Sequence, residues 1–393
     1  MRILQVALYG SVKGGTESYV GALCHGLRDL GHEVVLAYRY DPDPARPEVR
    51  AGRELAAISS QEQTADAARE VEALIADARP ELVHVHNVDA PWMPRFFAER
   101  VPTLYGVHDH RIDCPVGTRY WAAWHKGCTV VPGLKCLSYN VAAHCGSLRA
   151  NVTLRPYANW KQKRAEALRV PRIQVFSKYM AGMLTTSGIA RERIDVTAYP
   201  VPPMPDAATI PHGDTPVVFA TGRLVKEKGF ETLIAAMDHV PMPVELVIAG
   251  EGHFGEDLRR KSKTVASRHR VRFLGWLGPA ELAGWYLRAD VVAVPSAWPE
   301  PFGIVGLEAM AAGRAVVAPR IGGIEEWLSD GVTGIVVPPH DAEAFGAALA
   351  QLTADAGMRT RMGEAGRARA HDEFSLARHM ERVEALYKQV MHQ

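Results

Sequence analysis

The sequence from residue 291 to residue 313 reads Val291-Val-Ala-Val-Pro-Ser-Ala-Trp-Pro-Glu300-Pro-Phe-Gly-Ile-Val-Gly-Leu-Glu308-Ala-Met-Ala-Ala-Gly313. Its first four residues are apolar, which predicts a buried strand of a parallel sheet, because such strands are covered on both faces. The prolines that follow break the strand, and Ile304 to Ala312 is predicted to form a helix. Glu300 therefore lies in a strand-to-helix loop, and Glu308 lies about one turn into the helix. A parallel strand followed by a helix is typical of α/β folds.

The same loop carries groups that suit the parts of a nucleotide sugar. A carboxylate does not bind phosphate, but it accepts hydrogen bonds from hydroxyl groups, as sugars offer. Glu300 and Glu308 lie on either side of the predicted helix start and therefore predict contacts with a hexose and a ribose. The helix start itself leaves backbone N–H groups unpaired, which suits a diphosphate. These groups belong to Phe302, Gly303, Ile304 and Val305.

Length and composition limit the classes of protein that fit. The 393 residues are enough for two domains, and the 47% hydrophobic and 23% charged content is ordinary for a globular chain. A formal charge of +1 gives no global field that would attract nucleic acid. No apolar run approaches the roughly 20 residues of a membrane span. The apolar N-terminus contains Gln5 and leads into a glycine loop, which indicates a first strand rather than a signal peptide, so we expect a cytoplasmic protein without structural disulfides.

Strand-like and helix-like segments alternate along the chain, which predicts two α/β domains with parallel sheets. A proline-rich segment from Tyr199 to Pro205 predicts a linker between them. The expected domains span residues 1–200, with a cysteine-containing insertion at about 110–150, and residues 201–375, followed by a C-terminal helix over 376–393. Two doubly wound domains place their ligands at the carboxyl ends of the strands, facing a shared cleft. The expected strands are Ile3–Tyr9, Glu33–Tyr38, Leu82–His86, Thr103–Val107, Ile173–Phe176, Val217–Thr221, Val244–Ala249, Val271–Leu274, Val291–Val294, Ala315–Ala318 and Ile335–Val337.

A basic segment follows the first strand of the second half. Gly222, Arg223 and Lys228 are expected at the carboxyl end of that strand, where the phosphates of a ligand would lie. Arginine offers a planar fork of donors and lysine a compact charge, which together suit a diphosphate and could replace a divalent metal. The alternative is a solvated basic turn, and the nearby Glu300 loop favours the phosphate site.

Other loops at strand ends offer weaker signals, each with a structural alternative. Gly14 and Gly15 allow close backbone approach to a ligand, but they also suit a tight turn, and their loop has neither dinucleotide-binding nor P-loop spacing. His108 ends a strand and is predicted to point into the cleft, although a lone histidine is more often structural. The further candidates for donor binding are Glu251, and Trp276 with Leu277 as an apolar slot for a nucleobase or as packing residues. A second glycine pair, Gly322-Gly323, is predicted to allow close backbone approach.

The insertion raises two further hypotheses. It holds four cysteines, and several thiols in a reducing compartment suggest metal ligands such as those of a structural zinc site. Their spacing lacks the C-x-x-C pairs of zinc sites, so free thiols are the favoured interpretation. A basic stretch from Arg149 to Arg172 suits an anionic membrane face or an acceptor-binding surface, but a solvated helix face is favoured. The four cysteines are Cys114, Cys128, Cys136 and Cys145.

Taken in this order, the motifs resemble the retaining glycosyltransferases of family 4, which have the GT-B architecture of two facing Rossmann-like domains. The resemblance covers nearly the whole chain and rests on Gly14-Gly15, on Gly222-Arg223 with Lys228-Gly229, on Glu300-Pro-Phe-Gly-Ile-Val with Glu308-Ala, and on Gly322-Gly323. The proline-rich junction and the cysteine insertion depart from the family pattern.

The resemblance implies a role for each matching position. Glu300 would hold hydroxyls of the donor hexose and Glu308 the ribose, while Arg223 and Lys228 would bind the diphosphate with the backbone at Gly303 and Ile304. Gly15 would approach the donor phosphate, and His108 would contact the transferred sugar. Similar enzymes retain the anomeric configuration, require no metal or other cofactor, and pack their last helix back onto the first domain.

The sequence therefore predicts transfer of a hexose or N-acetylhexosamine from a nucleoside-diphosphate sugar, with UDP favoured over GDP, to an acceptor hydroxyl. The acceptor stays open among a glycan, a lipid-linked sugar and a small natural product. A nucleotide-sugar epimerase of the same architecture is an alternative, but it needs more acid–base groups than His108 alone. A non-catalytic nucleotide-sugar binding protein is a third hypothesis.

Overall fold

The computed structural model describes residues 1–11, 14–41, 52–146, 150–201, 210–211, 213–265 and 267–392. The chain divides into two compact units. The first unit comprises residues 1–119, 129–202 and 376–393, and the second comprises residues 120–128 and 203–375. Most of the predicted linker between Tyr199 and Pro205 lies outside the described residues.

The first unit is built on a seven-stranded, wholly parallel sheet with the strand order β3-β2-β1-β4-β5-β8-β9. Its strands are β1 (Arg2–Val6), β2 (Glu33–Tyr38), β3 (Arg53–Glu54), β4 (Leu82–Val85), β5 (Thr103–Val107), β8 (Arg172–Val175) and β9 (Ile194–Val196). Its helices are α1 (Gly15–Asp29), α3 (Ala65–Ala78), α4 (Met93–Ala98), α5 (Lys135–Ala142), α6 (Ala150–Ala167), α7 (Lys178–Thr186) and α14 (Leu376–Met391), with 3₁₀ turns η1 (Ala56–Ser59) and η2 (Arg191–Arg193).

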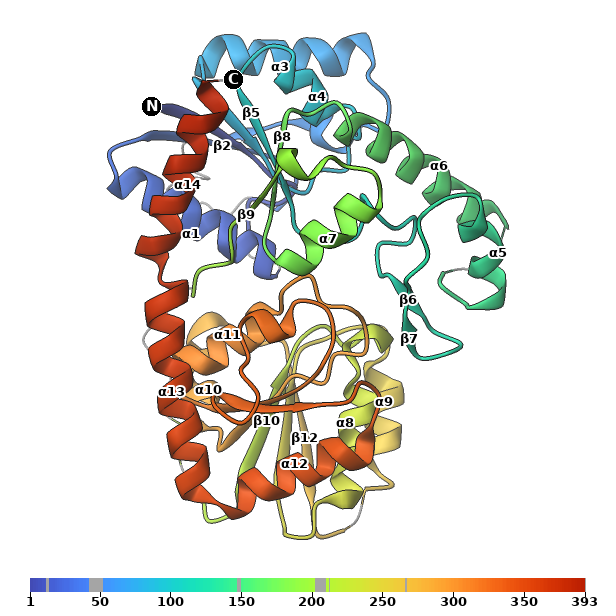
Figure 1. The fold of residues 1–393 in the computed structure, drawn as a ribbon, viewed down its shortest axis with the longest axis vertical. Helices are drawn as coiled ribbons and strands as arrows, with labels where there is room; N and C mark the ends of the chain where they lie inside the picture. Colours follow the sequence, from blue (N-terminus) through green and yellow to red (C-terminus); the bar gives the residue numbers. More distant parts are fainter. Residues whose placement is uncertain are drawn as a thin grey trace. The chain divides into compact units, whose positions relative to one another are not determined.

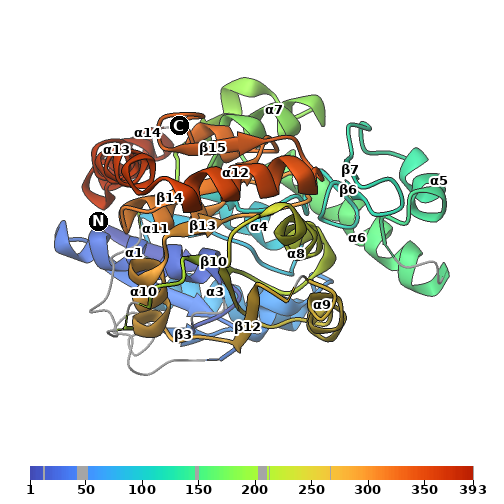
Figure 2. The ribbon, with the colours of Figure 1, turned by 90° about the horizontal axis from the view of Figure 1, so that it is seen from below.

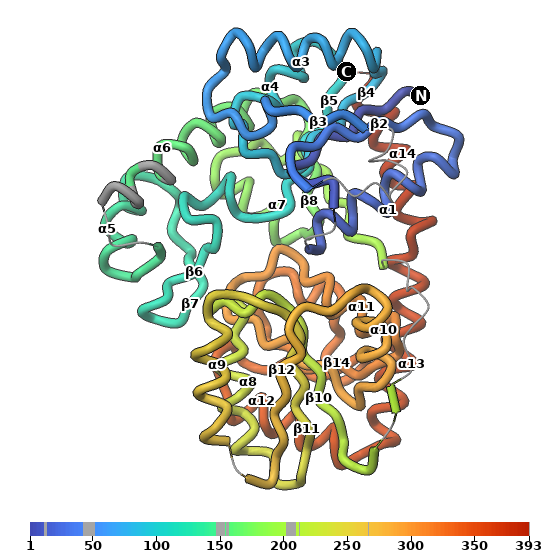
Figure 3. Tube along the Cα trace, turned by 180° about the vertical axis from the view of Figure 1, so that it is seen from behind, coloured from blue at the N-terminus to red at the C-terminus, as the bar shows by residue number. Residues whose placement is uncertain are grey.

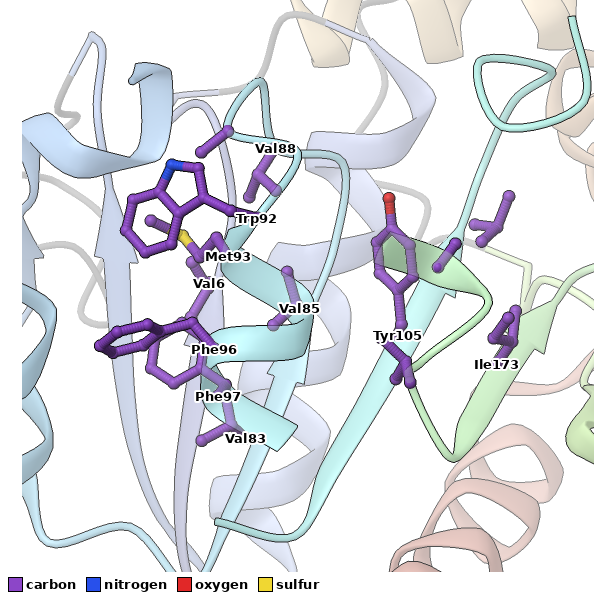
Figure 4. Packing of buried hydrophobic residues seen from close by; sticks show 14 of the residues in the cluster. Val6, Val83, Val85, Val88, Trp92, Met93, Phe96, Phe97, Tyr105 and Ile173 are labelled. Carbon is purple, nitrogen blue, oxygen red and sulfur yellow. The ribbon is translucent and has the colours of Figure 1, made fainter. Parts of the chain in front are cut away.

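Side chains alternate between the two faces of this sheet, and one face is apolar. Val6, Val83, Val85 and Tyr105 belong to one buried apolar cluster with Trp92, Phe96 and Phe97, all of which are labelled in Figure 4. Burial of this kind contributes about 25 cal/mol per Å² of apolar surface, so this core is the main source of stability in the unit.

The opposite face of the first sheet is covered by α1 and by the C-terminal helix α14. The two helices lie side by side in Figures 1 and 3, although they come from opposite ends of the chain. Gly26 of α1 touches Met380 of α14 so closely that a Cβ at Gly26 would lie 2.8 Å from the Met380 sulfur. The C-terminal helix therefore returns to the first unit, as predicted.

The second unit contains a six-stranded parallel sheet with the order β12-β11-β10-β13-β14-β15. Helices α8, α9 and α12 cover one face, and α10, α11 and α13 cover the other (Figure 2). The strands are β10 (Val217–Thr221), β11 (Glu245–Ala249), β12 (Arg270–Gly275), β13 (Val291–Ala293), β14 (Ala315–Pro319) and β15 (Gly334–Val337). The helices are α8 (Phe230–Ala236), α9 (Gly255–Ser262), α10 (Pro279–Arg288), α11 (Ile304–Ala311), α12 (Ala342–Ala354) and α13 (Ala356–Phe374), with 3₁₀ turns η3 (Lys226–Lys228), η4 (Met237–His239) and η5 (Ile324–Glu326).

The predicted fold class, two Rossmann-like α/β units with parallel sheets, is confirmed. Several details differ from the expected elements. The first strand ends at Val6 rather than Tyr9, and Tyr9 makes only an isolated bridge to Tyr40. A short antiparallel hairpin, β6 (Tyr120–Trp121) and β7 (Lys126–Gly127), interrupts the first half of the sequence and is counted with the second unit. No apolar periodicity marks strands of two residues, so the sequence did not indicate this hairpin.

Candidate functional site

The loop between β13 and α11 is locked by a buried tryptophan that comes later in the sequence. The Trp327 indole N–H donates to the carbonyl of Phe302 at 2.7 Å. Gly303 precedes α11 with φ at +99°, and a Cβ at Gly306 would lie only 1.9 Å from the Trp327 ring. Both positions therefore require glycine, one for its backbone conformation and the other for space. The amide groups of the first turn of α11 are consequently held in a fixed place.

Glu300 and Lys228 form an ion pair beside this helix start. The Lys228 Nζ lies 2.7 Å from the Glu300 Oε1, and the Ser296 hydroxyl donates to the same oxygen. Glu300 is only 5% exposed. Burial disfavours its ionised form, but the charge and hydrogen bond of Lys228, with Ser296 and Trp298, outweigh burial and lower the pKa of Glu300. Glu300 is thus a buried, ionised carboxylate that is paired with the Lys228 ammonium.

Two other loops hold the backbone around this pair. The Gly323 N–H donates to the Glu300 carbonyl at 2.8 Å, and a Cβ at Gly322 would lie 2.4 Å from the Glu300 nitrogen. The Glu227 carbonyl accepts hydrogen bonds from the N–H groups of Ala297 at 2.9 Å and Trp298 at 3.1 Å. The glycine pair at 322–323 is therefore needed for close backbone approach, and the backbone it approaches is that of Glu300.

Glu308 lies on α11 and is paired with a residue that the sequence did not indicate. The Tyr286 hydroxyl donates to the Glu308 Oε2 at 2.7 Å and also lies 3.3 Å from the Val305 carbonyl. Desolvation raises the pKa of Glu308 to about 7, against a smaller opposing effect of the Tyr286 hydrogen bond. Burial, reinforced by the neighbouring carboxylate, raises the pKa of Tyr286 well above its usual value, so Tyr286 stays a donor. Glu308 is half-buried.

The loops after β10, β11 and β12 are also joined through glycines. Gly250 has φ at +122°, and a Cβ there would lie 2.0 Å from the Gly222 carbonyl oxygen. Arg223 and Glu251 follow these glycines with exposed side chains, and Trp276 is 62% exposed while Leu277 is half-buried. The Trp276 indole is therefore accessible for stacking on a base. The predicted contacts of these four residues with a nucleotide stay predictions.

In the first unit, Gly14 and Gly15 lie at the start of α1, and Gly15 is its first residue. Gly14 is extended, with φ at −176°, and precedes the helix without a side-chain cap. The two glycines thus leave the beginning of α1 without side chains at these positions, which allows close approach of a ligand. Val12 and Lys13 of the same loop lie outside the described residues.

His108 is buried in a network of polar side chains on the face of the first sheet that α14 covers. Its Nε2 lies 3.0 Å from the His86 Nδ1, its Nδ1 lies 2.6 Å from the Tyr199 hydroxyl, and its ring stacks on Phe176. Burial lowers its pKa well below the usual value, so the ring is neutral. Both ring nitrogens are engaged within the first unit, which favours a structural role over the predicted contact with a sugar.

The network continues to the C-terminal helix. The Tyr387 hydroxyl lies 2.8 Å from the His84 Nδ1 and accepts a hydrogen bond from the Gln5 Nε2 at 3.0 Å. On the same helix, the His379 Nδ1 lies 2.8 Å from the carbonyl of Ala198. Buried polar groups are costly unless they are paired, so these contacts specify where α14 docks.

The described part of the insertion offers no support for the hypothesis of a structural metal site. Across the described ranges of the chain, no group of three or more His, Cys, Asp or Glu side chains is arranged to hold a metal ion. Cys114, Cys128, Cys136 and Cys145 form no disulfide bond in the part of the chain that the structure describes. Cys114, for example, accepts a hydrogen bond from the backbone of Arg119, and burial raises its pKa.

Within the described residues, no helix has the length and apolarity needed to cross a membrane.

Two family models match consecutive parts of the chain. The model described as Glycosyltransferase Family 4 matches residues 13–203, and the model described as Glycosyl transferases group 1 matches residues 206–369. A lipopolysaccharide core biosynthesis glycosyltransferase, LpsE of Rhizobium meliloti, is 38% identical over 162 residues, which are 41% of this chain and 46% of that protein. The chain spans about half the length of the curated relatives it matches, or less.

Two solved structures are similar over almost the whole chain. Sucrose-phosphate synthase from Thermosynechococcus elongatus superposes with a TM-score of 0.73 at 22% identity, covering 99% of both chains. HepE of Anabaena in complex with UDP superposes with a TM-score of 0.72 at 19% identity, covering 99% of this chain and 100% of that one. At such identities the likeness establishes the fold.

Proposed function

Since this chain belongs to the family 4 glycosyltransferases, we propose that it transfers a hexose or N-acetylhexosamine from a nucleoside-diphosphate sugar to an acceptor hydroxyl, with retention of the anomeric configuration. The observation that carries the proposal is the Lys228–Glu300 pair at 2.7 Å, next to the first turn of α11. A cation and a hydroxyl-accepting carboxylate at one helix start suit the two sides of a sugar–phosphate bond.

In this reaction the bond between the anomeric carbon and the phosphate oxygen breaks while the acceptor oxygen bonds to the same face of that carbon. The acceptor proton passes to the departing phosphate oxygen, so no protein base is required. Lys228 and Arg223 stabilise the charge that develops on the diphosphate, with the amides of α11. Glu300, released in part from Lys228, accepts hydrogen bonds from hexose hydroxyls, and Glu308 accepts them from the ribose.

We infer that the donor carries UDP. HepE, which shares the fold, has been solved with UDP and with UDP-glucose, and LpsE acts in lipopolysaccharide core biosynthesis. These names support a UDP-hexose as donor and a sugar-bearing acceptor for this chain. None of the proteins reported above is named as an epimerase, which favours transfer.

The test is a panel of UDP- and GDP-sugars incubated with purified protein, with release of nucleoside diphosphate and the fate of the sugar both followed. A transferase releases the diphosphate slowly to water and faster to an acceptor, and NMR of the product then reports the retained anomer. Sugar conversion without diphosphate release would instead identify an epimerase, and binding without either would identify a sensor. Lys228→Ala should lower turnover at least about tenfold while nucleoside-diphosphate binding persists, because its contribution is greatest in the transition state.

A further inference from the structure

The hairpin formed by residues 120–128 packs on the loop that carries Glu300. Tyr120 is buried and forms an apolar cluster with Ala297 and Trp298. On the other strand of the hairpin, Gly127 lies against Pro299, where an added Cβ would be 2.9 Å from the proline Cγ. The hairpin therefore contacts Ala297, Trp298 and Pro299, the three residues directly before Glu300.

Further contacts hold the hairpin at Tyr120 and at its base. The Tyr120 ring stacks on His340 at 5.9 Å, and its hydroxyl lies 3.3 Å from the His125 Nδ1. At the base, Arg119 is almost fully buried and donates to the carbonyl of Val130 at 2.6 Å and to the Asp113 carboxylate at 2.8 Å. The contact between Arg119 and Val130 joins the segments just before and just after the hairpin, so Tyr120 has a defined position.

Trp298 connects Tyr120 to the ion pair. The Lys228 ammonium lies over the Trp298 ring, 5.2 Å from its centroid, and the Trp298 indole is among the groups that stabilise the ionised Glu300. The Trp298 backbone N–H is held by the Glu227 carbonyl, one residue before Lys228. A displaced Trp298 side chain would therefore disturb Lys228 and Glu300 together.

We propose that Tyr120 is a positioning residue for the transfer reaction, which acts through Trp298 to hold Lys228 and Glu300 in the geometry needed at the sugar–phosphate bond. The inference rests on the proposed function. The hairpin lies in the predicted insertion at about 110–150, so this chain uses a segment of its first half to order the donor loop of the second unit. The nucleotide end of the donor is held elsewhere, at Glu308 and the start of α11, and does not depend on Tyr120.

The test compares Tyr120→Ala, Tyr120→Phe and Gly127→Ala with wild type, with Lys126→Ala as matched control. Lys126 lies on the same hairpin with an exposed side chain. Turnover is measured as UDP released from the donor to water, and UDP affinity is measured separately by calorimetry. We expect Tyr120→Ala and Gly127→Ala to lose about tenfold to a hundredfold in kcat, because small misplacements of reacting groups cost this much. Their UDP affinity should stay within about threefold of wild type, whereas Tyr120→Phe and Lys126→Ala keep both quantities.

Wild-type kcat in both Tyr120→Ala and Gly127→Ala would overturn the proposal. A parallel loss of UDP affinity and of the melting temperature would also overturn it, because the hairpin would then be a general stabiliser of the unit. If Tyr120→Ala does not fold, Gly127→Ala decides, since it moves the hairpin while Tyr120 is retained. Lys228→Ala is run beside these variants, and wild-type turnover in that variant would count against the proposed function itself.

Discussion

Tyr286 donates a hydrogen bond of 2.7 Å to Glu308, and the two residues come from different helices, α10 and α11, 22 positions apart. The phenol is fully buried, and desolvation raises the pKa of its carboxylate partner to about 7. The group proposed to bind the ribose is therefore close to half-protonated at neutral pH in the ligand-free protein. This relationship leads to a first prediction on pH.

Donor binding should weaken as the pH falls below 7. Ribose hydroxyls donate to the ionised carboxylate, so a protonated Glu308 must release its proton before it can accept both hydrogen bonds. Because the pKa in the free protein is about 7, the dissociation constant of UDP should rise by up to about tenfold per pH unit below that value. Calorimetry of UDP binding measures how the dissociation constant changes with pH. The range runs from pH 5.5 to pH 8, about 1.5 units below to about one unit above this pKa. Glu308→Gln should bind UDP more weakly at pH 8 and lack most of this dependence.

The same pKa has the opposite effect on stability. Its value in the folded state is raised above the 4.5 of an ordinary glutamate, so the folded protein holds the proton more tightly than the unfolded chain. The contribution of Glu308 to the free energy of unfolding is fully present below pH 4.5 and is lost as the pH rises through about 7. The difference in unfolding free energy between wild type and Glu308→Gln should therefore shift in favour of the variant between these pH values. A difference that does not change with pH would contradict the raised pKa.

The Lys228–Glu300 pair should behave as a coupled unit in unfolding experiments. Lys228→Met leaves a buried carboxylate without its cation and is expected to cost about 3 kcal/mol. The double variant Lys228→Met/Glu300→Gln should recover about 1 kcal/mol or more of that loss, because the unpaired charge is gone. Urea unfolding of the wild type, both single variants and the double variant gives the coupling energy. Strict additivity of the two single changes would show that the pair contributes nothing to stability.

Gly322→Ala should damage the donor loop, and Gly331→Ala provides a matched control. Both glycines have positive φ, at +61° and +72°, so alanine brings a similar backbone strain of about 1–2 kcal/mol at each. At Gly322 the new Cβ would also lie 2.3 Å from the Glu300 carbonyl oxygen, whereas at Gly331 it meets nothing within 4 Å. We expect Gly322→Ala to lose clearly more stability and to lower turnover by more than about tenfold. Similar losses in the two variants would mean that the close approach to Glu300 is not tight.

Trp276→Ala should weaken nucleotide binding. The indole is 62% exposed on the loop after β12, and stacking of a base on an aromatic ring is worth about 1–3 kcal/mol. The dissociation constant of UDP should therefore rise at least about fivefold, as measured by calorimetry. Val332→Ala removes another exposed apolar side chain of the same unit and serves as the control. An unchanged affinity would place the base away from Trp276.

Turnover should not depend on a divalent metal. Arg223 and Lys228 are proposed to stabilise the departing diphosphate, the role that a divalent cation has in other transferases. Donor turnover in excess EDTA should stay within about twofold of the untreated protein, because a lost electrostatic contact to the leaving group would cost far more. Activity that is abolished by EDTA and restored by Mg²⁺ or Mn²⁺ would contradict this assignment.

Much of the fold was readable from the sequence because its signals are local. The apolar run at 291–294 and the glycines and prolines after it predicted β13 and α11, each of which ends one residue before its predicted end. The same reasoning placed Glu300 in a loop and Glu308 on a helix. It failed for the hairpin at 120–128, because strands of two residues show no apolar periodicity.

Periodicity, glycine and proline act on neighbouring residues, so the sequence by itself determined the alternating strands and helices, the two α/β units and the loops that hold the candidate residues. The pairings among those residues depend on distant parts of the chain. Lys228 meets Glu300 across 72 positions, and Tyr387 meets His84 across 303. Such contacts follow from strand order and helix packing, which bring loops together at one edge of a sheet and helices onto its faces. Only the tertiary structure therefore decided that Glu300 pairs with the Lys228 ammonium, that Glu308 accepts a hydrogen bond from a tyrosine, and that His108 is buried.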